Sequence, residues 1–266
     1  MTSSNEFQFF WSEGPLDWSG WLCLRSFTRY SDVTIHLYSY DRNLKLEIPK
    51  CICHDASEVF PREIYERVKN SFARTYGEAA GYRETSDLFR YKLLYEKGGW
   101  YFDTDCILIK QLTPLFDLDY VFAWETTDKV FVGTAIIKFP KNTEMLDQLY
   151  KNFVQTDPKT WQHGITFMSL FTEYLRKFDL TDKTLSPEYF YPLYWDQSTQ
   201  QQSSSEDRTY IIHLWQAAPF YRELDLLRQI EALQKQIEAL NNSLSLRIAR
   251  KIPFGKEIRN LVAKDE

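Results

Sequence analysis

Short apolar runs alternate with helix-spaced apolar positions along the first 220 residues of the chain. The runs are typical of buried strands, and spacings of three and four residues are typical of helices that bury one face. The predicted strands are 7–11, 33–38, 100–102, 120–124, 135–139 and 210–215. The predicted helices are 18–30, 57–76, a segment from Thr85 or Ser86 to Gly98, 143–154 and 164–177. Strand, helix and strand in succession predict an α/β domain with βαβ units.

The pattern changes after residue 220, which divides the chain into three predicted parts. Residues 1–220 form the α/β domain, within which the polar stretch 195–208 reads as a mobile loop. Residues 221–246 form a heptad helix, whose apolar seam at 226–244 either self-associates as a homodimer or folds back on the domain. Residues 247–266 form a basic amphipathic tail, and 247–264 either contacts a membrane surface peripherally or ends the chain without order.

Composition narrows the function classes. The chain has 266 residues and a net charge of −5, so the basic footprint of a nucleic-acid binder is absent. Neither a signal-peptide pattern at the N-terminus nor an apolar run of 18 residues is present, which predicts a cytoplasmic protein, peripheral at the inner face of a membrane if the tail binds there. Four cysteines are too few for a disulfide scaffold, and the pair at 51 and 53 lacks the further ligands of a zinc site.

Asp103 and Asp105 form a D-x-D motif directly after the aromatic strand 100–102. Ligands of open α/β sheets bind at the carboxyl ends of the strands. Two carboxylates at this edge suit Mn²⁺ or Mg²⁺, a hard cation that would also bind a diphosphate. A second D-x-D, at 117–119, follows Pro114 with no strand before it, and reads as a solvated turn.

Asp87 and Arg90 precede this motif on a predicted helix. Their spacing of three residues places them on one helical face. The pair is either a surface ion pair of little energetic value or a pair of groups that hold a sugar and a phosphate.

The run SDLFRYKLLYEKGGWYFDTD at 86–105 joins these features within 20 residues. It resembles the glycosyltransferases that have a DXD-containing sugar-binding region, which include bacterial capsular and surface-polysaccharide enzymes, yeast initiating mannosyltransferases and the glucosyltransferase domain of large clostridial toxins. The resemblance implies a GT-A fold, a Rossmann-like sandwich with a mixed sheet. It also implies transfer of a sugar from a UDP- or GDP-sugar to a glycan or lipid-linked glycan, with retention of the anomeric configuration and a role in surface polysaccharide synthesis.

The same resemblance implies roles for individual residues. The matching segments extend from FFW at 9–11 to HLW at 213–215. Asp105 would be the principal metal ligand, with Asp103 and His213 beside it. The donor-binding residues would be Trp11 on the base, Asp87 and Arg90 on the sugar, Tyr101 and Asp103 on ribose and sugar, and Trp215 on the leaving phosphate. Asp103 and Asp105 would be the catalytic residues.

Some features depart from the family or remain open. The entry I-P-K-x-I-H before the first strand is missing, and Val132-Gly133-Thr134 stands where many relatives have Asn. His213 is either a metal ligand or a core histidine. The sequence shows no further carboxylate for a nucleophile, so we expect attack from the front face, with the leaving diphosphate accepting the acceptor's proton. The alternatives are a Mg²⁺-dependent phosphatase of the haloacid dehalogenase type and a non-catalytic coiled-coil interaction protein.

Overall fold

A computed structural model describes residues 5–157, 160–162, 165–193 and 206–216, together with the helical residues 222, 225–237 and 239. The chain divides into two compact units, Met1–Trp215 and Gln216–Glu266. The first unit carries every predicted site residue.

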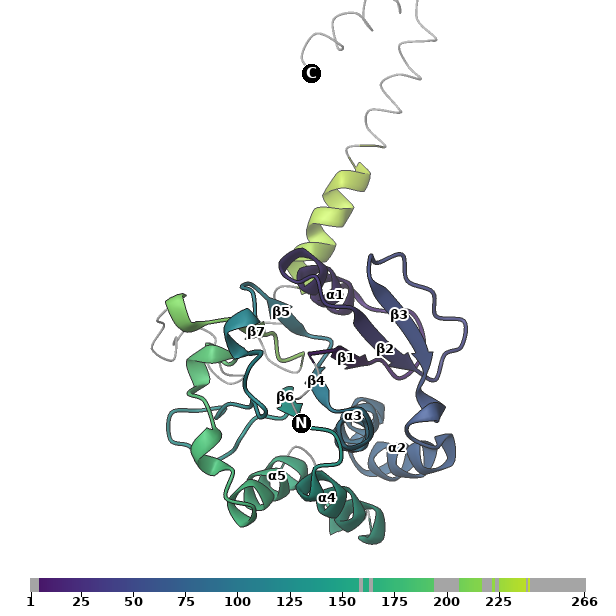
Figure 1. The fold of residues 1–266 in the computed structure, drawn as a ribbon. Helices are drawn as coiled ribbons and strands as arrows, with labels where there is room; N and C mark the ends of the chain where they lie inside the picture. The colour runs from purple at the N-terminus through teal and green to yellow at the C-terminus, as the bar shows by residue number, and fades with distance from the viewer. Residues whose placement is uncertain are drawn as a thin grey trace, which may run out of the picture. The chain divides into compact units, whose positions relative to one another are not determined.

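A five-stranded sheet forms the centre of the first unit, in the order β3-β2-β1-β4-β6 (Figure 1). Four strands are parallel, and β6 runs antiparallel to β4. A separate antiparallel pair consists of β5 and β7. The strands are β1 (Phe7–Phe10), β2 (Ile35–Ser39), β3 (Cys51–Asp55), β4 (Gly99–Phe102), β5 (Cys106–Leu108), β6 (Ile136–Phe139) and β7 (Ile211–His213).

Alternate residues of the sheet enter two different hydrophobic cores. In β4, Trp100 and Phe102 belong to one core, whereas Tyr101 belongs to the other. Successive side chains of a strand point to opposite faces, so a sheet buried on both faces reads as a continuous apolar run. All four residues of β1, β4 and β6 are accordingly buried.

Helices cover both faces of the sheet (Figure 1). Helix α1 contributes to the core that contains Trp100, and the other four α-helices contribute to the core that contains Tyr101. The helices are α1 (Trp18–Tyr30), α2 (Arg62–Tyr76), α3 (Glu78–Lys97), α4 (Glu144–Gln155) and α5 (Thr166–Lys177). The described 3-10 helices include η1 (Ala56–Glu58), η2 (Thr113–Leu115), η4 (Thr181–Lys183), η5 (Pro187–Tyr189) and η6 (Glu206–Arg208).

The predicted α/β class with a mixed sheet is confirmed, as the resemblance to GT-A enzymes implied. Helix α1 has the predicted bounds, and β1, β2, β4, β6, β7, α4 and α5 lie within two residues of them or inside them. The predicted helix 57–76 is wrong at its start: Asp55 caps the short η1, and α2 begins only after Pro61. Proline fixes its own φ and suits the first turn of a helix, which explains the late start.

Other predicted boundaries were also wrong. Helix α3 begins at Glu78, about seven residues before the predicted start, because Gly77 with a φ of 89° ends α2 and lets a new helix begin at once. Residues 120–124 form isolated bridges instead of a regular strand. Strands β3 and β5 were not predicted, since β3 is an edge strand with exposed positions and β5 has only three residues.

In the second unit, the described residues 225–237 are helical, and Leu226, Ile230, Leu233 and Ile237 are exposed. Most of the predicted seam beyond 237 and the whole tail 247–266 lie outside the described residues. The three-part division, the homodimer and the membrane contact therefore stay predictions. Among the described residues, no helix is both long enough and apolar enough to cross a membrane.

Candidate active site

The D-x-D motif lies where β4 leaves the sheet. Strand β4 is held between β1 and β6, and the backbone N–H of Asp103 still donates to the carbonyl of Ala135 at 2.8 Å. The chain then turns at Thr104 and Asp105 into β5. This is the carboxyl edge of the parallel strands, where open α/β sheets bind ligands.

Arg90 of α3 connects the predicted sugar-binding residues. Its guanidinium lies 2.9 Å from Asp103 Oδ1 and 3.2 Å from Asp87 Oδ1, and it donates to Thr134 Oγ1 at 2.8 Å. The Tyr101 hydroxyl donates to Asp103 Oδ1 at 3.0 Å. The Arg90 side chain is 3% exposed, so this is a buried network and not the surface ion pair that spacing alone allowed.

Burial dominates the electrostatics of this network. It raises the pKa of Asp87 and of Asp103 to about 6, against the opposing effect of the Arg90 cation. Two buried carboxylates share one guanidinium, so the ionised form of each is stabilised less than it would be in a pair with its own cation. Both become more readily ionised when a further cation binds beside them.

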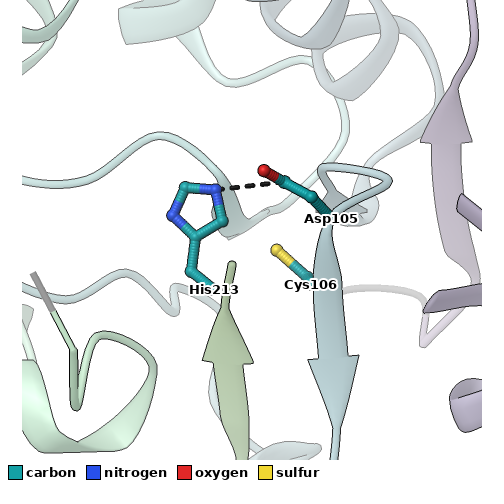
Figure 2. Close-up of side chains that lie close together, drawn as sticks. All are labelled: Asp105, Cys106 and His213. Carbon is teal, nitrogen blue, oxygen red and sulfur yellow. Dashed lines mark hydrogen bonds and ion pairs between the residues drawn. The ribbon is translucent and has the colours of Figure 1, made fainter. Parts of the chain in front are cut away.

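Asp105 and His213 meet through the pairing of β5 with β7, which places Cys106 opposite His213. Their side chains are almost buried, and Asp105 Oδ1 lies 3.1 Å from His213 Nε2 (Figure 2). Burial lowers the pKa of His213, but the carboxylates of Asp105, Asp103 and Glu125 together raise it above its usual value. His213 is therefore a buried strand residue that lies against an acidic group, and its role as a metal ligand stays a prediction.

Three side chains present donor atoms that fit a metal ion: Asp105, Cys106 and His213 have ligand atoms within 4.8 Å of one another (Figure 2). Burial raises the pKa of the Cys106 thiol well above its usual value, and a protonated thiol is a poor ligand. The carboxylate of Asp105 and the imidazole of His213 are the donors that remain. Within the described residues, Asp103 is not one of these three, and its Oδ1 accepts hydrogen bonds from Arg90 and Tyr101. Its predicted contact with a metal stays a prediction.

Two tryptophans were predicted to contact the nucleotide. Trp11 directly follows β1, and its indole N–H donates to the carbonyl of Gly14 at 3.1 Å. The ring of Trp215 lies against that of His213, with centroids 4.2 Å apart, and its indole N–H donates to the carbonyl of Leu193. Contacts of these rings with a base or a phosphate stay predictions.

Three residues near the site were missed by sequence reasoning. Thr134, first read only as a departure from the family, bonds both Arg90 and Asp87. Glu125 is 5% exposed and has His213 and Asp87 as its charged neighbours. No further carboxylate was predicted for the site from the sequence, and Glu125 is a buried one that interacts electrostatically with it. Tyr191 is fully buried beside His213. No local pattern marks any of these residues, because each joins the site through contacts distant in sequence.

Comparison with known proteins supports the relationship that the motif suggested. Residues 49–123 match the family model described as a glycosyltransferase sugar-binding region containing a DXD motif. Lactosylceramide 4-alpha-galactosyltransferase of Pongo pygmaeus is 27% identical over 149 residues, which cover 49% of this chain and 66% of that protein. The protein of the same name from Rattus norvegicus is 25% identical over 203 residues, which cover 66% of this chain and 54% of that protein.

Solved structures with a related shape include PaToxG glycosyltransferase, with a TM-score of 0.49 and 15% identity, covering 68% of this chain and 72% of that one. Mouse xyloside xylosyltransferase 1 has a TM-score of 0.45 and 10% identity, covering 79% of this chain and 97% of that one. The chain spans less than two thirds of the full length of either galactosyltransferase relative.

The fold and the acidic edge define an α/β protein whose D-x-D motif lies at the carboxyl edge of its sheet. Residues 49–123 are similar to the DXD-containing sugar-binding region of glycosyltransferases, and the chain is related to these enzymes, as the sequence resemblance predicted.

Proposed function

We propose that this chain is a metal-dependent glycosyltransferase that moves a hexose from a UDP- or GDP-sugar to a glycan or lipid-linked glycan. The observation that carries the proposal is the pairing of Asp105 with His213 beside the Arg90 network at one edge of the sheet. The pair of Asp105 and His213 suits a cation and a diphosphate, and the Arg90 network suits the hydroxyls of a sugar. The names of the two galactosyltransferase relatives favour a glycolipid acceptor.

In this proposal Asp105 and His213 would hold Mn²⁺ or Mg²⁺, and the cation would offset the charge that builds on the leaving nucleoside diphosphate. Asp87, Arg90 and Asp103 orient the donor sugar through the network already described. Trp11 stacks on the base, Tyr101 positions Asp103 and contacts the ribose, and Trp215 contacts the phosphate. The acceptor hydroxyl attacks from the face that the diphosphate leaves, and its proton passes to the diphosphate, so the configuration is retained.

A role in surface polysaccharide synthesis fits the same chemistry. The basic tail 247–264 would hold the enzyme at a membrane that presents lipid-linked acceptors, and the seam 226–244 would pair two copies. The exposed apolar residues of the described helix 225–237 support such pairing, because an unpartnered apolar face is costly in water.

The test is a donor screen by thermal shift with Mn²⁺, followed by a turnover assay of wild type and Asp105→Ala. A bound donor raises apparent stability by mass action, so we expect one nucleotide sugar to raise the melting temperature only with metal present. Wild-type turnover by Asp105→Ala would contradict the metal site. Metal-dependent release of phosphate from simple phosphoesters would favour the phosphatase, and the absence of any nucleotide binding would favour the interaction protein.

A further inference from the structure

Glu125 is a buried carboxylate that the proposed mechanism does not use. It follows the segment 120–124, and its backbone N–H donates to the carbonyl of Phe131 at 3.0 Å. The neighbouring Gly133 N–H donates to the carbonyl of Ala123 at 2.9 Å, so these two segments run side by side. Thr134, the next residue, bonds Asp87 and Arg90, and this places Glu125 close to the sugar-binding network.

The charged groups that act on Glu125 belong to two halves of the site, one that suits a cation and a diphosphate and one that suits a sugar. His213, which lies against Asp105, belongs to the half that suits a cation and a diphosphate, and Asp87 belongs to the half that suits a sugar. In a nucleotide sugar, the bond between the anomeric carbon and the diphosphate joins these two halves. Glu125 is buried, its segment pairs with the one that leads to Thr134, and its charge acts on one group of each half, which favours a place for it near that bond.

Two unpartnered polar atoms indicate that a ligand enters here. Tyr191 Oη and His213 Nδ1 are buried, and neither has a hydrogen-bond partner among the described residues. Glu125 is also the main charge acting on the Tyr191 hydroxyl. Buried polar atoms without partners are rare and costly, and a bound ligand or water normally satisfies them.

Gly133 makes room for this arrangement. A Cβ on Gly133 would collide with the hydroxyl and the ring of Tyr191. The glycine therefore allows the Tyr191 ring to lie directly on the backbone that leads to Thr134. Tyr191 in turn lies beside His213, with ring centroids 5.8 Å apart.

We propose that Glu125 is a further catalytic residue, whose carboxylate lies against the transferred sugar beside its anomeric carbon and stabilises the positive charge that develops there. This inference rests on the proposed glycosyltransferase function. The bond from the anomeric carbon to the diphosphate oxygen breaks, and the diphosphate keeps the electron pair. The acceptor oxygen then bonds to the anomeric carbon and its proton passes to the diphosphate. Glu125 forms no covalent bond and acts through its charge.

The test uses the full chain and the nucleotide sugar that wild type turns over. Glu125→Gln keeps the size and removes the charge, and we expect kcat to fall about 100-fold with the donor KM changed less than about threefold. The melting temperature should not fall. The matched control is Glu188→Gln, a partly buried carboxylate that pairs with Arg208 at 3.5 Å, for which we expect unchanged kcat.

A second variant separates catalysis from folding. In Glu125→Ala, added azide can occupy the vacated space and attack the anomeric carbon as the diphosphate leaves. We expect azide to restore donor breakdown and to yield a glycosyl azide, which a purely structural role would not produce. The inference is overturned if Glu125→Gln matches an active wild type, or if its loss appears only in KM. A wild type inactive with every donor would instead contradict the proposed function itself, and this inference with it.

Discussion

The chain contains two D-x-D triplets, and their surroundings differ completely. Asp105 is 8% exposed and lies against His213, and Asp103 is held by Arg90 and Tyr101. Asp117 and Asp119 are both exposed and follow the short helix η2. The same pattern is therefore part of a candidate site in one region and part of a surface turn in the other.

The difference originates in the element that precedes each triplet. Strand β4 is paired on both sides and fully buried, so the residues that follow it emerge at the sheet edge among α3 and β7. The element directly before Asp117 is the short helix η2 and not a strand, and Asp117 is exposed. An acidic pair can therefore take part in ligand binding when it lies at the carboxyl edge of a sheet, beside cationic and hydrogen-bonding groups.

Replacing one aspartate of each triplet by asparagine should give the largest difference in turnover. We expect Asp105→Asn to lower turnover about 1,000-fold, because an amide is a weaker ligand than a carboxylate and leaves the diphosphate charge less well offset. Asp119→Asn should keep wild-type turnover. Initial rates measured with Mn²⁺ and the preferred donor test this, and equal losses in both variants would remove the distinction between the two triplets.

Arg90→Lys should separate buried from exposed ion pairing. A lysine cannot reproduce the fork that reaches Asp103, Asp87 and Thr134 together, so we expect a loss of about 3 kcal/mol in the free energy of unfolding. Arg62→Lys is the control, because Arg62 pairs with Glu13 while half exposed and should cost less than about 0.5 kcal/mol. Urea denaturation measures both, and similar values for the two variants would contradict a buried network.

Glu125→Gln should change the dependence of stability on pH. Burial raises the pKa of Glu125 from 4.5 to about 7 in the folded chain, so its ionisation is disfavoured there. The stability that this group contributes below pH 4.5 is lost as pH rises through 7.

The Gln variant has no such loss. Relative to pH 4, it should therefore gain up to about 3 kcal/mol over wild type by pH 8. Urea denaturation without metal at both values provides the measurement. A difference between the two proteins that does not change with pH would show that Glu125 is solvated.

Gly133→Ala should lower the stability of the fold without touching a charged group. The new methyl group collides with Tyr191, and we expect a loss of about 1–3 kcal/mol as the ring moves away. Tyr191→Phe in the same chain should recover only part of this loss, because the ring as well as the hydroxyl lies close to Gly133. An unchanged melting temperature for Gly133→Ala would contradict the close packing.

The elements that were predicted correctly are those with a pattern in their own local sequence. The bounds of α1 follow from its apolar spacing between Asp17, which caps it, and Ser31. The place of Asp103 follows from the aromatic run before it. Boundaries failed where a glycine or proline reset the backbone, as at Pro61 and Gly77.

The site could be predicted only in part, for a physical reason. His213 lies 108 residues from Asp105, and only the family resemblance joined them in advance. Glu125 and Tyr191 reach the site through contacts that no local pattern encodes. The local sequence around these two residues does not distinguish them from other glutamates and tyrosines, and only the fold relates them to His213.

Calorimetric titration of UDP and GDP into the chain, with and without Mn²⁺, tests the role of Asp105 and His213 most directly. The expected result is nucleotide binding that requires Mn²⁺, persists in Asp119→Asn and disappears in Asp105→Asn. Binding of equal strength in all three proteins, or binding that is indifferent to the metal, would contradict a cation held between Asp105 and His213.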